Sequence, residues 1–101
     1  MADVKVGLYV RVEAKPGKEE EVAAFLRGGL GIVQEEPGTV AWFAVRLNLT
    51  AFAIFDAFSD GSARQAHLGG RLAATLMARA PKLLSQPPSV EQLDVLAHKV
   101  P

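Results

Sequence analysis

Two side chains that can move protons stand close together in the sequence. Asp56 is the single acid in the apolar run Phe52–Phe58, and His67 follows shortly after the turn residues Ser59 and Asp60. An imidazole with an ordinary pKa of about 6.5 can accept or donate a proton near neutrality. A strand-to-helix corner that carries an acid, an aromatic ring and a histidine could line a pocket, and the pair predicts acid–base chemistry on a small ligand.

Each of the two residues also has a structural interpretation. His67 could bond to a backbone carbonyl or to Asp56 and hold its helix on the sheet. A buried carboxylate must be paired or have a raised pKa, and Arg11 and Arg46 are candidate cross-strand partners for Asp56. Otherwise Asp56 would orient His67 or bind a substrate hydroxyl. His67 and Asp56 are thus the candidate catalytic residues, with both interpretations open.

Aromatic side chains near this corner are candidates for the wall of a substrate pocket. Trp42, Phe43 and Phe58 lie in apolar runs, and Leu72 lies on the apolar side of the next helical segment. Aromatic residues at strand spacing are also typical of a hydrophobic core. Tyr9 projects away from the apolar side of its own segment. We expect it at an interface or in the pocket, where its hydroxyl would suit a quinone-like carbonyl.

The composition limits the class of protein. The 101 residues fit one domain, 1–101, and eleven basic residues balance eleven acidic ones. This balance argues against a nucleic-acid partner, because phosphate binding needs a cationic surface. The chain has no cysteine and only two histidines, so we expect no metal site. No apolar run reaches the roughly 20 residues that cross a bilayer, and no basic segment precedes an apolar one. We therefore expect a cytoplasmic protein with no membrane partner.

The periodicity of the sequence predicts six elements. Alternating apolar and polar residues are typical of a half-buried strand, and apolar residues at i, i+3 and i+4 indicate a helix. Gly69-Gly70 is a candidate break in the second helix, and Pro81 is expected to end or weaken it. Gly28, Gly29 and Gly31 in the first helix indicate close packing on the sheet or the approach of a ligand. The predicted elements are strand 4–14, helix 18–36, strand 39–47, strand 51–58, helix 61–80 and strand 90–100.

The order β-α-β-β-α-β indicates an α+β, ferredoxin-like fold. In this arrangement a four-stranded antiparallel sheet carries both helices on one face. The strands 39–47 and 51–58 are apolar on both faces, so the face without helices would expose large apolar side chains. An exposed apolar face of this kind marks an interface. The simplest cover is a second copy of the chain, which predicts a homodimer joined through the sheet face.

The chain resembles the antibiotic biosynthesis monooxygenase (ABM) family, a branch of the dimeric α+β barrel superfamily. The resemblance rests on Glu13–Glu21 (EAKPGKEEE), Glu35–Thr39 (EEPGT), Phe52–Asp60 (FAIFDAFSD) and Ala66–Leu68 (AHL), and it covers nearly the whole chain. It implies a homodimer with one pocket per subunit, between the sheet and the helices. Family members that are enzymes oxidise quinols or polyketide aromatics with dioxygen and need no metal or flavin. Related proteins degrade haem or isomerise small metabolites.

The sequence departs from the family pattern at several positions. Asp56-Ala57-Phe58 stands where the family often has Glu-x-Trp, so an indole N–H donor is missing. Gly7 and Phe58 do not match the set of the haem-degrading branch, which makes haem cleavage an unfavoured activity. No second histidine follows His67 on its helix.

Residues and resemblance together predict a cofactor-independent monooxygenase-like enzyme for a small aromatic or quinol. In this hypothesis His67 deprotonates or hydrogen-bonds the substrate, Asp56 orients it, and the aromatic side chains exclude water. Two alternatives stay open. One is a non-catalytic dimeric module that binds a small ligand, and the other is an isomerase or lyase that uses the same acid and base without dioxygen.

Overall fold

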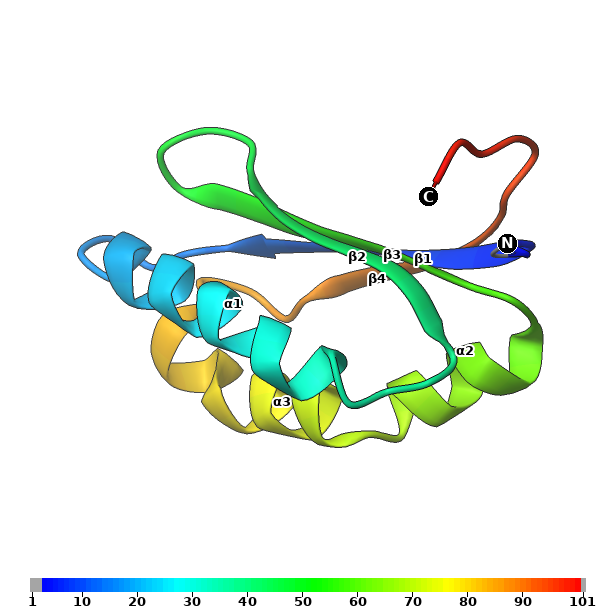
Figure 1. Ribbon diagram of the computed structural model, residues 1–101. Coiled ribbons are helices and arrows are strands. Elements are labelled where there is room, and N and C mark those ends of the chain that lie inside the picture. The colour runs from blue at the N-terminus through cyan, green and yellow to red at the C-terminus, as the bar shows by residue number, and fades with distance from the viewer. Residues whose placement is uncertain (1–2, 101) are drawn as a thin grey trace.

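The fold is a single antiparallel sheet with all of its helices on one face (Figure 1). The structure is a computed structural model that describes residues 3–100. The four strands lie in the order β2-β3-β1-β4, so the first and third strands of the chain form the centre of the sheet. The ferredoxin-like prediction is confirmed. The elements are β1 (Val6–Glu13), α1 (Glu19–Val33), β2 (Thr39–Arg46), β3 (Ala51–Phe58), α2 (Gly61–Leu68), α3 (Arg71–Leu83) and β4 (Ser89–Asp94).

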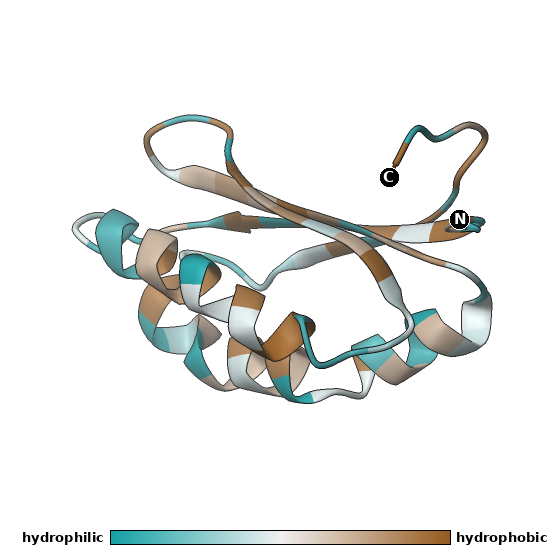
Figure 2. Ribbon diagram, viewed as in Figure 1, coloured by the Kyte–Doolittle hydropathy of each residue, from teal (hydrophilic) through white to brown (hydrophobic). Residues whose placement is uncertain are grey.

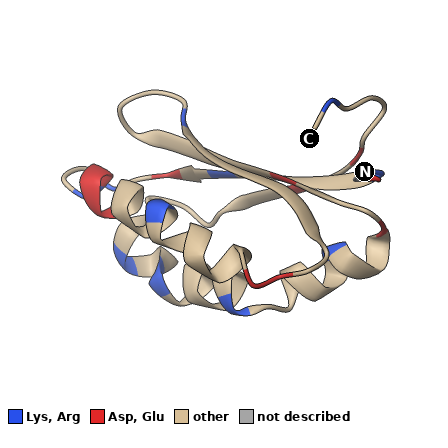
Figure 3. Ribbon diagram, viewed as in Figure 1, with Lys and Arg blue, Asp and Glu red and all other residues tan. Residues whose placement is uncertain are grey.

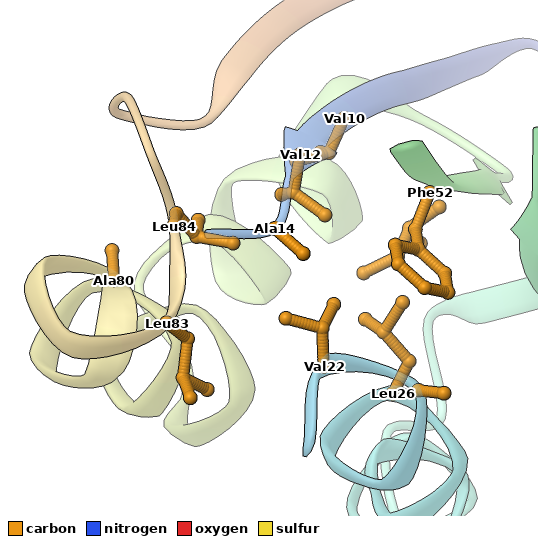
Figure 4. Packing of buried hydrophobic residues seen from close by; sticks show 11 residues of the cluster. Val10, Val12, Ala14, Val22, Leu26, Phe52, Ala80, Leu83 and Leu84 are labelled. Atoms are coloured by element: carbon orange, nitrogen blue, oxygen red, sulfur yellow. The ribbon is translucent and has the colours of Figure 1, made fainter. Parts of the chain in front are cut away.

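The hydrophobic core lies between the sheet and the helices (Figure 4). Leu8, Val10 and Val12 of β1 are all buried, as their alternation with polar residues predicts. They pair in register with Asp56, Ile54 and Phe52 of β3, so the matching positions of the two central strands share the covered face. The cluster at one end of this face consists of Val10, Val12, Ala14, Val22, Ala23, Leu26, Phe52, Ile54, Ala80, Leu83 and Leu84.

Helix α1 ends at Val33, before the predicted end at residue 36. The amide groups of Glu35 and Glu36 donate to the carbonyls of Ile32 and Val33 in tight turns, at 3.2 and 2.9 Å. Pro37 follows and disfavours helical backbone at the residue before it. Glu36 therefore lies in the connection between α1 and β2, where its side chain can turn back towards the sheet.

The second helical segment is two helices. Asp60 caps α2 by accepting a hydrogen bond from the amide of Ala63 at 2.8 Å. The chain then breaks at Gly69-Gly70, where the Gly70 amide donates to the carbonyl of His67 at 3.0 Å. Helix α3 continues past Pro81 to Leu83, so the expectation that Pro81 ends the helix is wrong. The break leaves His67 in the last turn of α2.

The last strand is shorter than predicted. β4 covers Ser89–Asp94, whereas the alternation in the sequence predicted a strand over 90–100. The Val95 amide still donates to the carbonyl of Lys5 at 2.9 Å, and the chain then leaves the sheet. It rises on the side away from the helices (Figure 1), and Leu96 is 97% exposed.

The face of the sheet without helices carries apolar side chains. Figure 2 shows hydrophobic residues along most of β2 and β3. Phe43 is 54% exposed and Val45 is 42% exposed, while Tyr9 and Phe55, which are paired across β1 and β3, are half-buried. The expectation that large apolar groups face outward here is confirmed. Among residues 3–100, no helix has the length and apolar character that crossing a membrane requires.

Candidate active site

A cavity of about 160 Å³ lies between the sheet and the helices α2 and α3. Most of its wall is apolar, and its two ionisable side chains are Asp56 and His67. A small apolar cavity with a few convergent polar groups is the usual form of a ligand site. The lining residues are Leu8, Val10, Ile54, Asp56, His67, Leu68, Leu72, Ala73, Leu76, Met77, Pro88 and Val90.

Asp56 reaches the cavity because of its register in β3. It is the only charged residue of that strand (Figure 3). It lies between Leu8 of β1 and Trp42 of β2 on the covered face, and it is 0% exposed. Neither arginine considered as its partner reaches it. Arg46 lies 3.0 Å from Glu20, and Arg11 lies 3.9 Å from Glu13.

The partner of Asp56 is His67. Nε2 of His67 lies 2.9 Å from Oδ2 of Asp56, which joins the end of α2 to the middle of the sheet. The imidazole is also fixed by Phe58, whose ring centre lies 5.3 Å from the centre of the His67 ring. Phe58 is itself 0% exposed, so the ring of His67 packs against a fully buried aromatic side chain.

The other ring nitrogen of His67 contacts a second carboxylate. Nδ1 lies 2.6 Å from Oε1 of Glu36, in the connection between α1 and β2. The same oxygen accepts a hydrogen bond from Oγ1 of Thr39 at 2.8 Å. The site is therefore a row of three groups, Asp56, His67 and Glu36, that come from three separate segments of the chain.

The two carboxylates change the protonation of His67. Burial alone would lower the pKa of the imidazole, but hydrogen bonding to Asp56 and to Glu36, together with their charges, raises it above 6.5 overall. At a given pH near neutrality the ring is thus protonated to a greater extent than an ordinary histidine. The row thus holds two carboxyl groups and one imidazole.

Asp56 has an unused hydrogen-bond acceptor. Within the described residues, Oδ2 has the contact with Nε2 of His67 at 2.9 Å, and Oδ1 has no hydrogen-bond partner. A buried acceptor without a donor costs about 1–3 kcal/mol. Because Asp56 lines the cavity, a donor on a ligand or a water molecule in the cavity would relieve this cost.

The predicted site residues fall into two groups. Leu72 lines the cavity with Asp56 and His67, and Phe58 packs on the His67 ring. Trp42 lies on the same covered face and packs partly against the core, with its Nε1 buried and unpartnered among the described residues. Phe43 and Tyr9 are paired with residues at odd positions of β3. They therefore lie on the open face of the sheet and do not line this cavity.

Sequence reasoning did not assign a role to Glu36. The residue belongs to the EEPGT segment that carries the family resemblance, and this was its only signal. Nothing in the spacing of residues 36 and 67 indicates that their side chains meet. Among residues 3–100, no group of three or more His, Cys, Asp or Glu side chains is arranged to hold a metal ion.

Comparison with known proteins places the fold in a definite class. No family model matches the chain, and no curated protein matches it. A solved antibiotic biosynthesis monooxygenase superposes with a TM-score of 0.77 at 17% identity, over 91% of this chain and 99% of its own. A Bacteroides thetaiotaomicron protein of unknown function, described as a possible oxidoreductase, gives a TM-score of 0.77 at 16% identity, over 93% and 100% of the two chains. The fold is that of the antibiotic biosynthesis monooxygenase structures.

A much nearer relative defines the family. The NE2512 protein of Nitrosomonas europaea, whose function is unknown, is 50% identical over 97% of this chain and 95% of its own, with a TM-score of 0.95. The chain therefore belongs to the same family as this protein of unknown function.

Proposed function

We propose that the protein is a monooxygenase-like oxidoreductase that acts on a small neutral phenol or quinol, with dioxygen as the co-substrate. The observation that carries this proposal is the buried carboxylate of Asp56, which lines an apolar cavity and has an oxygen with no donor. The names of two proteins with the same fold, an antibiotic biosynthesis monooxygenase and a possible oxidoreductase, support the reaction class.

The geometry favours Asp56 as the group that takes the proton from the substrate. Oδ1 is free to accept a hydrogen bond from a substrate hydroxyl, whereas both ring nitrogens of His67 already face carboxylates. The sequence suggested the reverse assignment, with His67 as the base. In this proposal His67 holds Asp56 in place and offsets its charge, so that the carboxylate can remain buried.

The reaction balances without any other reagent. Transfer of the hydroxyl proton to Asp56 leaves an electron-rich anion, which passes an electron to dioxygen. The two radicals combine to form a carbon–oxygen bond, and the resulting peroxide anion takes the proton back from Asp56 to give a hydroperoxide. Cleavage of its oxygen–oxygen bond, with loss of the ring hydrogen at that carbon, releases water. One quinol and one dioxygen thus give one hydroxyquinone and one water.

Size and charge define the substrate class. A dry cavity of about 150 Å³ accommodates benzene, so about 160 Å³ suits a single substituted ring. The row formed by Asp56, His67 and Glu36 has two acidic groups and one basic group, and this excess of acidic groups disfavours an anionic ligand. The wall of leucine, isoleucine, valine and methionine side chains favours an uncharged ring with one or two hydroxyl groups.

Oxygen uptake with a panel of substituted hydroquinones tests the proposal. The wild type should consume dioxygen in proportion to the hydroxyquinone formed. Asp56→Asn should lower the rate by at least about 100-fold, because it removes the proton acceptor. Asp94→Asn, an exposed acid at the end of β4, is the matched control and should leave the rate unchanged. No uptake by the wild type with any quinol, or equal rates in wild type and Asp56→Asn, would contradict the proposal.

A second candidate is a binding module without catalysis. It is favoured by the two carboxylates around His67, which give the imidazole a structural role in joining α2 to the sheet. Quinol binding by calorimetry without any oxygen uptake would indicate this function. Turnover of a small metabolite that continues under nitrogen would indicate an isomerase or lyase instead.

We also propose that the open face of the sheet is the interface of a homodimer. The exposed side chains of Phe43 and Val45 and the half-buried Tyr9 and Phe55 form an apolar surface that a second copy could cover. Analytical ultracentrifugation should give twice the chain mass of 10.8 kDa at micromolar concentration. Phe43→Glu should shift the protein to a monomer, and a wild type that sediments as a monomer would contradict the interface.

A further inference from the structure

His67 lines two separate hollows of the protein. One is the inner cavity that contains Asp56, and the other is a surface groove of about 550 Å³ on the far side of the imidazole. The groove is formed by the connection between α1 and β2 and by the start of α2. Its wall contains Glu36, Thr39 and Asp60 as well as His67.

Exposure increases along the row of three groups. The side chain of Asp56 is 1% exposed, that of His67 is 8% exposed and that of Glu36 is 21% exposed. Glu36 is thus the member of the row that meets solvent. Its contact with Nδ1 at 2.6 Å is shorter than the contact of Asp56 with Nε2 at 2.9 Å. The ring orientation that brings Nε2 to Asp56 is the one in which Nδ1 faces Glu36.

We propose that Glu36 is the positioning residue of the site: from the outer groove it fixes the His67 ring with Nε2 towards Asp56 and holds it as the imidazolium. This inference rests on the proposed function, in which Asp56 accepts the substrate proton. Glu36 does not touch the cavity. It acts through His67, as the outer partner of a histidine fixes the role of the inner nitrogen.

The other charged groups near His67 have different partners. Arg64, one turn earlier on α2, donates from Nη1 to the carbonyls of Leu93 and Gly7, at 3.2 and 3.4 Å. Asp60 caps α2 through the Ala63 amide. Asp56 and Glu36 are therefore the two charges that set the protonation of His67, one from β3 and one from the connection that precedes β2.

The variant Glu36→Gln distinguishes the effect of the hydrogen bond to Nδ1 of His67 from the effect of the carboxylate charge. The amide oxygen of glutamine can still accept a hydrogen bond from Nδ1–H, but it carries no charge to hold the imidazolium. Glu35→Gln is the matched control, because Glu35 is an exposed neighbour that lines the same groove and has no contact with His67. The pH titration of the His67 ring, followed by NMR on the folded protein, gives a readout that does not depend on turnover.

The expected result is a His67 titration that moves to lower pH in Glu36→Gln and stays at the wild-type position in Glu35→Gln. With a quinol that the wild type oxidises, kcat should fall about tenfold or more in Glu36→Gln, with KM little changed. The pH profile of kcat should move with the titration. A purely structural contact would leave that profile in place.

An unchanged His67 titration in Glu36→Gln would overturn the inference. Should that variant fail to fold, Glu36→Asp keeps the charge but draws the carboxylate back from Nδ1, and its unchanged titration would overturn the inference equally. Failure of the proposed function has a different signature, since the wild type would then consume no dioxygen while the titration of His67 still responds to Glu36→Gln.

Discussion

Nε2 of His67 lies 2.9 Å from Oδ2 of Asp56, and this contact joins the last turn of α2 to the centre of the sheet. Both side chains are buried, at 8% and 1% exposure. A buried ion pair of this kind contributes little net stability, because the cost of removing both charges from water offsets most of their attraction. Removal of one partner, however, leaves the other charge buried and unpaired.

Stability should depend on pH through His67. Its pKa is raised in the folded protein above the ordinary value of 6.5, so the folded state binds more protons than the unfolded state between these two values. The stabilisation is complete below about pH 6.5 and is lost as the pH rises through the folded pKa. Urea unfolding at a series of pH values should therefore show wild-type stability falling across this window.

His67→Gln is the control for the pH dependence. It removes the titrating group and leaves the other ionisable residues of the chain in place. The variant should be less stable than the wild type at pH values below the window, and the difference should shrink above it. A difference that grows with rising pH in this window would contradict the raised pKa.

The double variant His67→Leu/Asp56→Leu should be more stable than the single variant His67→Leu. His67→Leu leaves the Asp56 carboxylate buried without a partner and should cost about 3–5 kcal/mol of unfolding free energy. Addition of Asp56→Leu removes that charge, so the double variant should recover part of the loss. Denaturant unfolding of the two single variants and the double variant measures the coupling. Additive losses would mean that the pair does not interact as its distance indicates.

The central strands were the easiest part of the fold to predict. β3 was predicted at its observed bounds, because Asn48 and Ser59-Asp60 interrupt an otherwise apolar run. The C-terminal strand was predicted too long, since Val95 continues the alternation but the chain leaves the sheet after one last hydrogen bond to Lys5. The residue at which a strand ends depends on its pairing with the neighbouring strand, and the alternation within one segment carries no information on that pairing.

The glycines of α1 give a matched stability test. A Cβ at Gly29 would lie 3.2 Å from Cδ1 of Leu72 and 3.3 Å from Cζ2 of Trp42, whereas a Cβ at Gly28 would meet no atom within 4 Å. Gly28→Ala should therefore raise the unfolding free energy by about 0.5–1 kcal/mol through helix propensity. In Gly29→Ala the same gain in unfolding free energy should be cancelled, because the added methyl group would crowd Trp42 of β2 and Leu72 of α3. Equal stabilisation by both, measured as the shift of the thermal midpoint, would contradict the packing.

A larger side chain in the cavity should weaken ligand binding while the protein still folds. Ala73 lines the cavity, and Ala78 lies exposed on the same helix. Ala73→Leu should reduce quinol affinity by at least about tenfold through loss of ligand volume, with little loss of thermal stability. Ala78→Leu carries the same substitution and should bind like the wild type in calorimetry. Equal affinity in the two variants would place the ligand elsewhere.

The site was only partly predictable. The pair Asp56 and His67 could be recognised because a lone acid in an apolar strand and a histidine on the helix that directly follows are both able to line a pocket between sheet and helix. Glu36 could not, since its contact depends on the early end of α1 and on the break at Gly69-Gly70. Whether Phe43 and Tyr9 face the pocket depends on the register of β2 and β1 with β3, which the sequence does not reveal. The observed register turns both side chains to the open face of the sheet.

The role of Asp56 as the proton acceptor is tested most directly by a crystal structure of the protein with a small hydroquinone, grown under nitrogen so that the ligand stays reduced. We expect one ring in the cavity beside Leu72 and Met77, with a hydroxyl oxygen at hydrogen-bond distance from Oδ1 of Asp56. A cavity without the ring at saturating hydroquinone, or a ring bound only in the outer groove beside Glu36, would contradict it.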